Sequence, residues 1–234
     1  MDYIIREIRP EDDRAVEQII RFCLKEYGGD REGTAWCDPD LGRFSALYQG
    51  EGRRYWVALD EAGAVVGGSG IGPLEGVEGV SELQKMYCLP AARGTGAAHR
   101  LMERCLGYAA RHYRTCYLET FGNMAAAQRF YAKYGFVRLD EPMGGTGHWS
   151  CDVWCARGLN GPLILPYTRG RLGDVLDFER RLRAEEDFWG WEIDGAYTAA
   201  VERSFSDPRF ANARSLLAYV DGAVVGRIDS TLIC

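Results

Sequence analysis

The sequence lacks the features that mark several special classes of protein. None of its eight cysteines forms a CxxC pair, which argues against a metal site or a disulfide framework. No stretch approaches the roughly 20 apolar residues of a membrane helix, and acids such as Asp2 and Glu7 stand where a signal peptide is basic. Positive charge is not in excess, since a net charge of -6 disfavours nucleic acid and anionic membranes as partners. We therefore expect a cytoplasmic protein with no metal and no nucleic-acid or membrane partner.

What is present suits a folded sheet protein. The 234 residues are 47% hydrophobic and 26% charged, which allows an ordinary packed core. That length lies between one large domain and two average ones. Strand and helix patterns alternate through the first 157 residues, so the expected fold class is α/β or α+β, with a mixed central sheet flanked by helices.

Hydrophobic periodicity predicts the order of these elements. Helices are expected after Pro10, after Asp38, over residues 97–109 and over residues 127–134, where Gly135 ends the last one. Strands with a period of two are expected at seven places: residues 4–8, 55–59, 64–68, 81–89, 116–120, 136–139 and 150–155.

A boundary is expected at residues 158–162, a short run that contains Gly and Pro. Beyond it the chain repeats part of itself. The pentapeptide GAVVG at 63–67 recurs at 222–226, an offset of 159 positions that also places Ile5 on Ile164. Residues 163–234 predict a strand, two helices and a hairpin, the order of the first elements. We therefore expect one domain at 1–157 and an incomplete, duplicated unit at 163–234.

A glycine-rich loop lies between the strand at 81–89 and the helix that comes after it. Small residues let the backbone approach an anion closely, and the first N–H groups of the helix point at it. Arg93 adds a fixed positive charge. The loop has neither the ending of a Walker loop nor the GxGxxG of a Rossmann fold, so it is interpreted as a pyrophosphate cradle or, alternatively, as a simple helix cap. Its residues are Arg93, Gly94, Thr95, Gly96, Ala97 and Ala98.

Two motifs resemble those of the GNAT family of N-acetyltransferases. The first, R-x-x-G-x-A at 93–98, resembles the family's acyl-CoA-binding motif, and the second is A-x-x-F-Y-x-x-x-G-F at 127–136. The segments ELQKMY, YLET and TGH are similar to a bacterial branch described as acetylating small amines such as free amino acids. The resemblance covers residues 3–157 and implies a GNAT-type sheet, acetyl-CoA as the acyl donor and a small-molecule amine as the acceptor.

The resemblance also implies roles for individual residues. Met86, Tyr87 and Cys88 align with positions whose backbone holds the pantetheine arm, and Tyr131 aligns with the tyrosine that protonates the departing thiolate. Acetyl transfer needs a neutral amine, so a carboxylate on the central strand is expected to accept its proton. Glu82 is that candidate, with a water chain or a plain surface role as its alternatives. Side chains alternate along a strand, which predicts one shared face for four residues: Glu82, Gln84, Met86 and Cys88.

The acceptor side and the mechanism stay open at this point. Candidate acceptor contacts are scattered along the chain, each with a packing role as its alternative: Trp36, Asp38, Tyr48, Glu119 and His148. Direct transfer in a ternary complex is favoured over an acetyl-Cys88 intermediate, since no histidine neighbours Cys88 in sequence. Other functions consistent with the motifs are a non-catalytic acyl-CoA sensor and a protein-lysine acetyltransferase. The unfinished second sheet predicts an open edge that packs on the first domain or on another subunit, as in a homodimer.

Overall fold

The larger of two sheets occupies the N-terminal two thirds of the chain. The computed structural model describes residues 2–186, 192–210 and 213–231. The strand order is β1-β2-β3-β4-β5-β7-β6; β4 and β5 pair in parallel, and the other neighbours pair antiparallel. The strands of this sheet are β1 (Ile4–Glu7), β2 (Arg54–Leu59), β3 (Val65–Pro73), β4 (Val80–Cys88), β5 (Thr115–Thr120), β6 (Val137–Arg138) and β7 (Val153–Gly158). The predicted mixed sheet is therefore confirmed.

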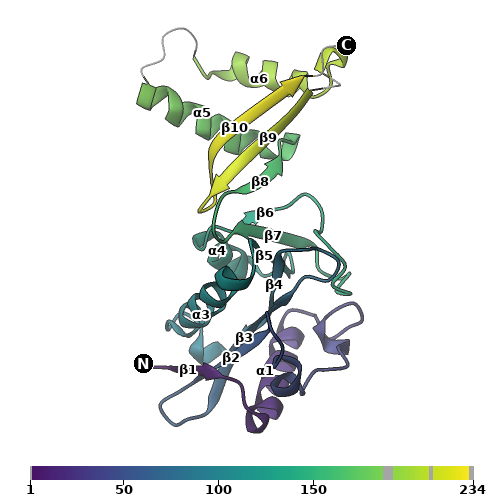
Figure 1. The fold of residues 1–234 in the computed structure, drawn as a ribbon, viewed down its shortest axis with the longest axis vertical. Coiled ribbons are helices and arrows are strands. Elements are labelled where there is room, and N and C mark those ends of the chain that lie inside the picture. The colour runs from purple at the N-terminus through teal and green to yellow at the C-terminus, as the bar shows by residue number, and fades with distance from the viewer. Residues whose placement is uncertain (1, 187–191, 211–212, 232–234) are drawn as a thin grey trace.

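Helices cover both faces of this sheet (Figure 1). On one face lie α1 (Asp13–Glu26) and the single turn α2 (Phe44–Leu47), and on the other lie α3 (Ala97–His112) and α4 (Ala125–Lys133). The apolar stripes of α1 and α3 are buried: Val16, Ile19, Ile20, Cys23, Leu101, Met102, Cys105 and Ala109. Among the described ranges, no helix has the length and apolarity needed to cross a membrane.

The helix expected after Asp38 forms only one turn. The apolar pattern that suggested it is instead an aromatic cluster, in which the Phe44 and Tyr48 rings lie 5.1 and 5.2 Å from the Tyr55 ring. Tyr48 and Tyr55 lie in turn over Gly68 and Gly70 of β3, where a Cβ atom would come within 2.8 Å of a ring. Glycine at these positions therefore lets the large rings pack against the sheet.

The middle of the sheet opens into a fork. β4 pairs with β5 only from Val80 to Glu82, opposite Thr115 to Tyr117, and the two strands separate beyond that point. Lys85 has a left-handed backbone, with φ of +51°, and the register between β3 and β4 shifts beside it. A bulge of this kind re-aims the strand that contains it.

The bulge also changes which way the side chains of β4 point. Before it, Gln84 accepts a hydrogen bond from the Tyr48 hydroxyl on the α1 face, at 2.7 Å. After it, Met86 and Cys88 belong to the apolar cluster under α3. The prediction that Glu82, Gln84, Met86 and Cys88 share one face is therefore wrong, because strand alternation does not continue through a bulge.

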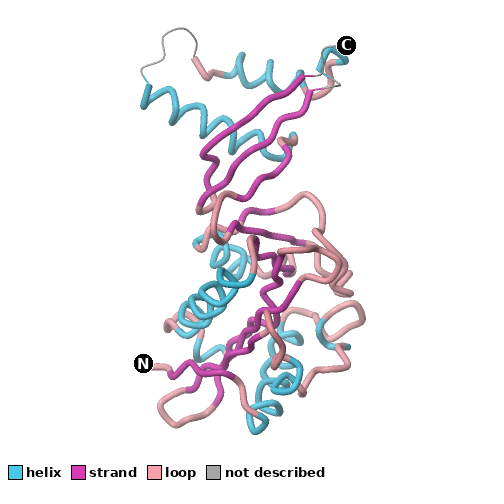
Figure 2. Tube along the Cα trace, viewed as in Figure 1, coloured by secondary structure: helices cyan, strands magenta, loops and turns pink. Residues whose placement is uncertain are grey.

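The C-terminal unit, residues 163–231, forms a second sheet in the order β8-β9-β10, seen as a separate lobe in Figure 2. Its strands are β8 (Leu163–Pro166), β9 (Ala213–Val220) and β10 (Ala223–Thr231), and its helices are α5 (Leu172–Glu186) and α6 (Gly195–Ser204). Adding the offset of 159 found in the sequence to the first residue numbers of β1, α1 and β2 gives the first residue numbers of β8, α5 and β9. Both units thus place strand, helices and hairpin in the same order.

The C-terminal unit packs on the larger sheet, as expected from its open edge. One apolar cluster joins Tyr117, Val137 and Ala156 of the first region to Leu163, Leu165, Val175 and Leu217 of the second. Polar contacts add to it, because Arg171 donates to the Arg138 carbonyl at 3.1 Å and Arg157 lies 3.6 Å from Asp221. β7 continues to Gly158, so it enters the predicted linker by one residue.

Candidate functional site

The glycine-rich loop forms an open cradle at the start of α3. Gly94 and Gly96 have φ of +73° and +101°, and a Cβ at either position would meet nothing within 4 Å. The Arg100 amide donates to the Gly96 carbonyl at 3.1 Å, so the amides just ahead of it are the unsatisfied donors of the helix start. These donors, the helix dipole and the open approach suit an anion.

A mostly apolar cavity of about 230 Å³ adjoins this cradle. It is lined by Met86, Tyr87 and Cys88 from β4, Arg93, Gly94 and Ala98 from the cradle, and Tyr131 from α4, together with Cys23, Tyr27, Met124, Ala126, Ala127 and Phe130. Seven of the residues predicted from sequence thus meet in one place. Ala97 instead faces the core, and the Thr95 hydroxyl bonds the Ala92 carbonyl and the Tyr3 hydroxyl.

Arg93 does not offer a free charge to the cradle. Its two terminal nitrogens donate to Glu26 of α1 at 2.7 and 2.6 Å, and its Nε donates to the Cys88 carbonyl at 2.9 Å. Hydrogen bonds from Arg93 lower the pKa of Glu26, which keeps that carboxylate charged. The structure therefore shows Arg93 tying α1 to the end of β4, a contact that the loop sequence alone did not reveal.

Glu82 lies at the base of the fork and is 8% exposed. Burial raises its pKa, although the Gln84 amide, which donates to it at 2.6 Å, lowers the pKa in part. The Tyr48 hydroxyl holds that Gln84 side chain from the other end. A buried carboxylate with a raised pKa, fixed in orientation by a chain of hydrogen bonds, has the properties of a general base.

A charged cluster lies beside the fork on the α1 side. The Asp38 carboxylate forms an ion pair with Lys85 Nζ at 2.5 Å and lies 2.9 Å from His148 Nε2. Burial would raise the pKa of Asp38, but the hydrogen bond from His148 and the charge of Lys85 lower it to about 2. Lys85 was missed in the sequence, because its role depends on the bulge at its own backbone, and a bulge leaves no signal in residue order.

The other acceptor candidates separate into those near the fork and those outside it. Glu119 accepts hydrogen bonds at 2.7 Å from Tyr117 and from Thr146, the latter in the loop that also contains His148. Trp36 instead lies under the Arg21 guanidinium, 4.8 Å from its ring centre. The structure thus brings Asp38, Glu119 and His148 to the fork region and assigns Trp36 to packing.

Tyr131 and Cys88 are both protonated at neutral pH. Tyr131 is 8% exposed, and burial raises its pKa well above the usual value. Burial likewise raises the pKa of the Cys88 thiol, to about 12. A tyrosine that keeps its proton can serve as an acid, whereas a thiol with so high a pKa is a poor nucleophile. Among the described residues, no group of three or more His, Cys, Asp or Glu side chains is arranged to hold a metal.

Comparisons with known proteins agree with this geometry. A family model described as an acetyltransferase (GNAT) domain matches residues 51–138. A protein of Escherichia coli (strain K12), described as the uncharacterized N-acetyltransferase YjgM, is 38% identical over 159 residues, which cover 67% of this chain and 95% of that protein. The chain therefore belongs to the GNAT family of N-acetyltransferases.

Solved structures extend the likeness to the fold. An acetyltransferase of the GNAT family from Staphylococcus aureus Mu50 matches with a TM-score of 0.61 and 21% identity, covering 68% of this chain and all of that one (100%). A phosphinothricin acetyltransferase from Sinorhizobium meliloti, solved in complex with AcCoA, matches with a TM-score of 0.52 and 23% identity, over 68% of this chain and 89% of the other. The predicted fold class and enzyme class are both confirmed.

Proposed function

We propose that the chain transfers an acetyl group from acetyl-CoA to the amine of a small molecule, directly, in a complex that holds both substrates. The observation that carries this proposal is the fork. Beyond Glu82, the backbone of β4 is released from β5 and runs along the cavity that contains Tyr131. An extended thioester arm and an acceptor amine can therefore meet between a candidate base and a candidate acid.

The residues of the N-terminal region fit acetyl-CoA as the donor. The open cradle at Gly94 and Gly96 offers helix amides to a pyrophosphate, and the freed edge of β4 from Met86 to Cys88 offers backbone groups to the amides of pantetheine. The apolar lining of the cavity suits the rest of that arm. Acetyl-CoA supplies the activated acyl group, and the chain supplies position and proton transfer.

The proton inventory balances with two side chains. Glu82 accepts a proton from the ammonium of the acceptor, and the freed amine nitrogen forms a bond to the thioester carbonyl carbon. As the carbon–sulfur bond breaks, the sulfur takes a proton from the Tyr131 hydroxyl. The nitrogen loses its second proton in becoming the amide, and that proton restores the Tyr131 hydroxyl, while Glu82 gives its proton to solvent. The raised pKa of Glu82 suits a base that must hold the proton it receives, and Tyr131 enters the reaction protonated.

The acceptor side favours a small cationic amine. Glu82, Glu119 and Asp38 supply three carboxylates around the fork, and the charge of Lys85 balances only part of them. An acetyl-Cys88 intermediate is disfavoured by the high pKa of its thiol. We also propose that residues 163–234 are an incomplete second GNAT-like unit, since they repeat the element order of the first region and their described part contains no glycine cradle.

The proposal is tested by a thiol-release assay with acetyl-CoA against the twenty amino acids and common small amines. Turnover with at least one amine is expected, with sequential kinetics. Tyr131→Phe is expected to lower kcat by about a hundredfold while leaving the affinity for CoA, measured by calorimetry, unchanged. CoA binding without turnover for any amine would favour the sensor instead, and ping-pong kinetics would restore the acetyl-cysteine route.

A further inference from the structure

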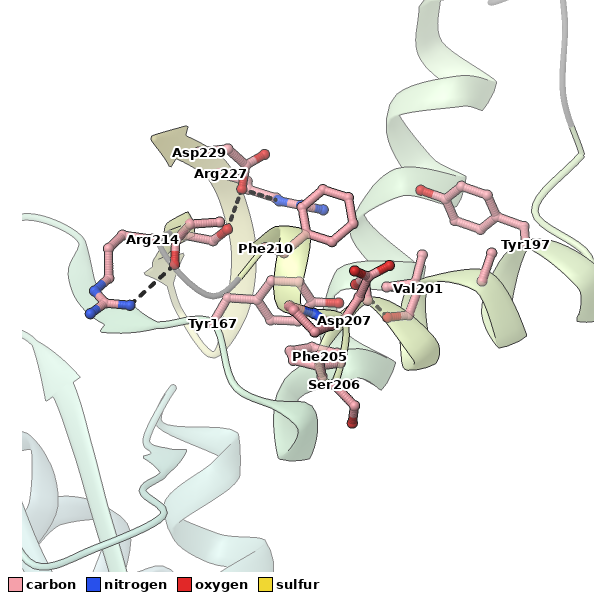
Figure 3. Close-up of a pocket in the computed structure, with 15 residues that line it drawn as sticks. Tyr167, Tyr197, Val201, Phe205, Ser206, Asp207, Phe210, Arg214, Arg227 and Asp229 are labelled. Carbon is pink, nitrogen blue, oxygen red and sulfur yellow. Dashed lines mark hydrogen bonds and ion pairs between the residues drawn. The ribbon is translucent and has the colours of Figure 1, made fainter. Parts of the chain in front are cut away.

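A hollow of the C-terminal unit lies between its sheet and α6, on the side shown in Figure 3. Its volume is about 780 Å³, within the range of small-molecule sites. Four aromatic rings line it, those of Tyr167, Tyr197, Phe205 and Phe210. The carboxylates of Asp207 and Asp229 lie among them (Figure 3).

The same place in the N-terminal region is filled. There, the Ile8 amide donates to the Tyr55 carbonyl at 3.0 Å, just as the Tyr167 amide donates to the Ser215 carbonyl at 2.9 Å. Tyr55 pairs with Gly70 across the strands, whereas Ser215 pairs with Asp229. The backbone pairing is thus equivalent in the two units. Where the Tyr55 ring packs on Gly70 in the N-terminal region, the C-terminal unit has the small Ser215 side chain beside the Asp229 carboxylate.

A second glycine of the filled core is also replaced. Gly68, which lies under the Tyr55 ring, pairs with Val57, and the corresponding pair in the C-terminal unit is Arg227 with Leu217. Two glycines that admitted a buried aromatic core have therefore become charged residues. The C-terminal unit therefore has a cavity lined by aromatic rings and charged groups, where a packed interior would be more stable.

The walls of the hollow already hold one cation against a ring. The Arg227 guanidinium lies 5.0 Å from the centre of the Tyr167 ring and is balanced by Glu179 at 3.1 Å and Asp229 at 3.0 Å. Asp207 is paired with Arg209, which donates to both of its carboxylate oxygens, at 2.6 Å in the shortest contact, through a side chain that is 82% exposed. A ligand cation that bonds to Asp207 therefore competes with the Arg209 guanidinium, which has room to turn to solvent.

Tyr167 has a polar group that its surroundings leave unused. Its hydroxyl is buried and has no hydrogen-bond partner among the residues that the structure describes. Figure 3 shows this hydroxyl directed to the side of the hollow where Asp207 lies. The Phe205 ring packs against Tyr167 at 5.1 Å and closes the floor. A buried hydroxyl without a partner is costly, and it calls for a group to bond to.

We propose that this hollow binds an organic ammonium ion, a small primary amine with an apolar body. The ammonium would donate hydrogen bonds to Asp207 and to the Tyr167 hydroxyl, and the aromatic rings would surround the body and the charge. The amine would occupy a site separate from the fork, in a unit whose described part has no acetyl-CoA cradle. This binding does not depend on acetyl transfer.

Calorimetry with phenethylamine tests the proposal on the full chain without acetyl-CoA. Neutral 2-phenylethanol and anionic 3-phenylpropionate serve as matched probes, and each is expected to bind at least about tenfold more weakly than the amine. Asp207→Asn should reduce amine affinity about tenfold while keeping the acceptor that the Arg209 amide uses at 2.9 Å. Asp194→Asn is its control, since Asp194 caps α6 outside the hollow.

Two further variants keep the test independent of folding. Ala200→Phe, on the exposed side of α6, should fill the hollow and abolish amine binding. Tyr167→Phe should weaken binding several-fold without lowering stability, whereas Tyr219→Phe, which loses a bond to Asp174 at 2.8 Å, should lower stability and leave binding unchanged. The proposal is overturned if no probe binds, if the neutral isostere binds equally well, or if binding is lost in Glu82→Gln but kept in Asp207→Asn and Ala200→Phe.

Discussion

The two sheets of this molecule begin on the same plan and differ in how far the chain extends it. In each, a strand, helices and a hairpin form three antiparallel strands, β1-β2-β3 in one and β8-β9-β10 in the other. Only the first sheet continues, within the described residues, into a bulged strand, a glycine cradle and a long helix. The chemistry proposed for Glu82, the cradle and Tyr131 lies in that continuation, so the plan that the two sheets share contains none of the residues to which this chemistry is assigned.

The faces of the two sheets show the same difference. In the first region, α3 covers Trp56, Ala58 and Ile71 of the sheet. In the C-terminal unit, four aliphatic side chains on the face opposite α5 are between 42% and 66% exposed: Ile164, Leu216, Val220 and Ile228. Apolar side chains gathered on one sheet face promote association. The helix after the cradle therefore covers a sheet face whose counterpart in the C-terminal unit carries exposed apolar side chains.

The largest effect should come from Glu82, which lies in the segment that follows the plan shared by the two sheets. Glu82→Gln is expected to lower kcat by about a hundredfold or more. The acidic limb of the pH profile, where activity falls as the pH drops through the raised pKa of Glu82, should disappear with it. Steady-state kinetics across pH measure both effects. Glu78→Gln, an exposed acid just before β4, is the control, and an unchanged pH limb in Glu82→Gln would mean that a water chain serves as the base.

Leu217→Ala tests whether the two regions melt separately. Leu217 is fully buried in the cluster that joins the regions, so the change should cost about 2–5 kcal/mol. Hydrogen exchange should quicken in β8–β10 and stay slow in β2–β4. Leu101→Ala, on the buried side of α3 in the other cluster, should show the reverse order. Equal loss of protection in both regions would show that they form one cooperative unit.

Substitutions at Arg93 and Glu26 should change the affinity for CoA by a smaller amount and in opposite directions. Arg93→Gln should weaken CoA binding about tenfold, because it removes a charge near the cradle and the tie between α1 and β4. Glu26→Gln should strengthen it several-fold, since the guanidinium is then released toward the pyrophosphate. Calorimetry with CoA measures both. If the two variants weaken binding equally, the pair acts only by holding α1 in place.

Asp38 should give the smallest effect, on acid stability. Its pKa is about 2 in the folded chain against an ordinary 3.8, so its contribution is complete above the ordinary value and is lost as the pH falls through the folded one. Asp38→Asn should therefore reduce the urea midpoint near neutral pH and flatten its fall between pH 3.8 and about 2. A wild-type midpoint that is already flat in that window would contradict the ion-pair assignment.

Hydrophobic periodicity predicted the helices and strands well. The arrangement of side chains in the candidate site depends instead on tertiary contacts. The helical stripe at Leu101 and Cys105 and the cradle at Gly94 and Gly96 are local patterns, and the structure places them as expected. The link between Arg93 and Glu26 joins residues 67 positions apart, and that between His148 and Asp38 spans 110. Contacts at such separation depend on how the sheet is wound. The bulge at Lys85 is a local change of backbone conformation that the residue pattern did not predict.

The cluster that joins the two sheets has a consequence for how the chain folds. Leu163, Leu217 and Tyr219 complete their packing on Tyr117, Val137 and Ala156, which belong to strands made earlier during synthesis. A chain synthesised from its N-terminus can fold the larger sheet first and then use its far edge as the surface on which the last strands condense. In refolding from denaturant, the C-terminal strands should therefore gain protection only after β5 and β7, so the order of synthesis and the order of assembly coincide.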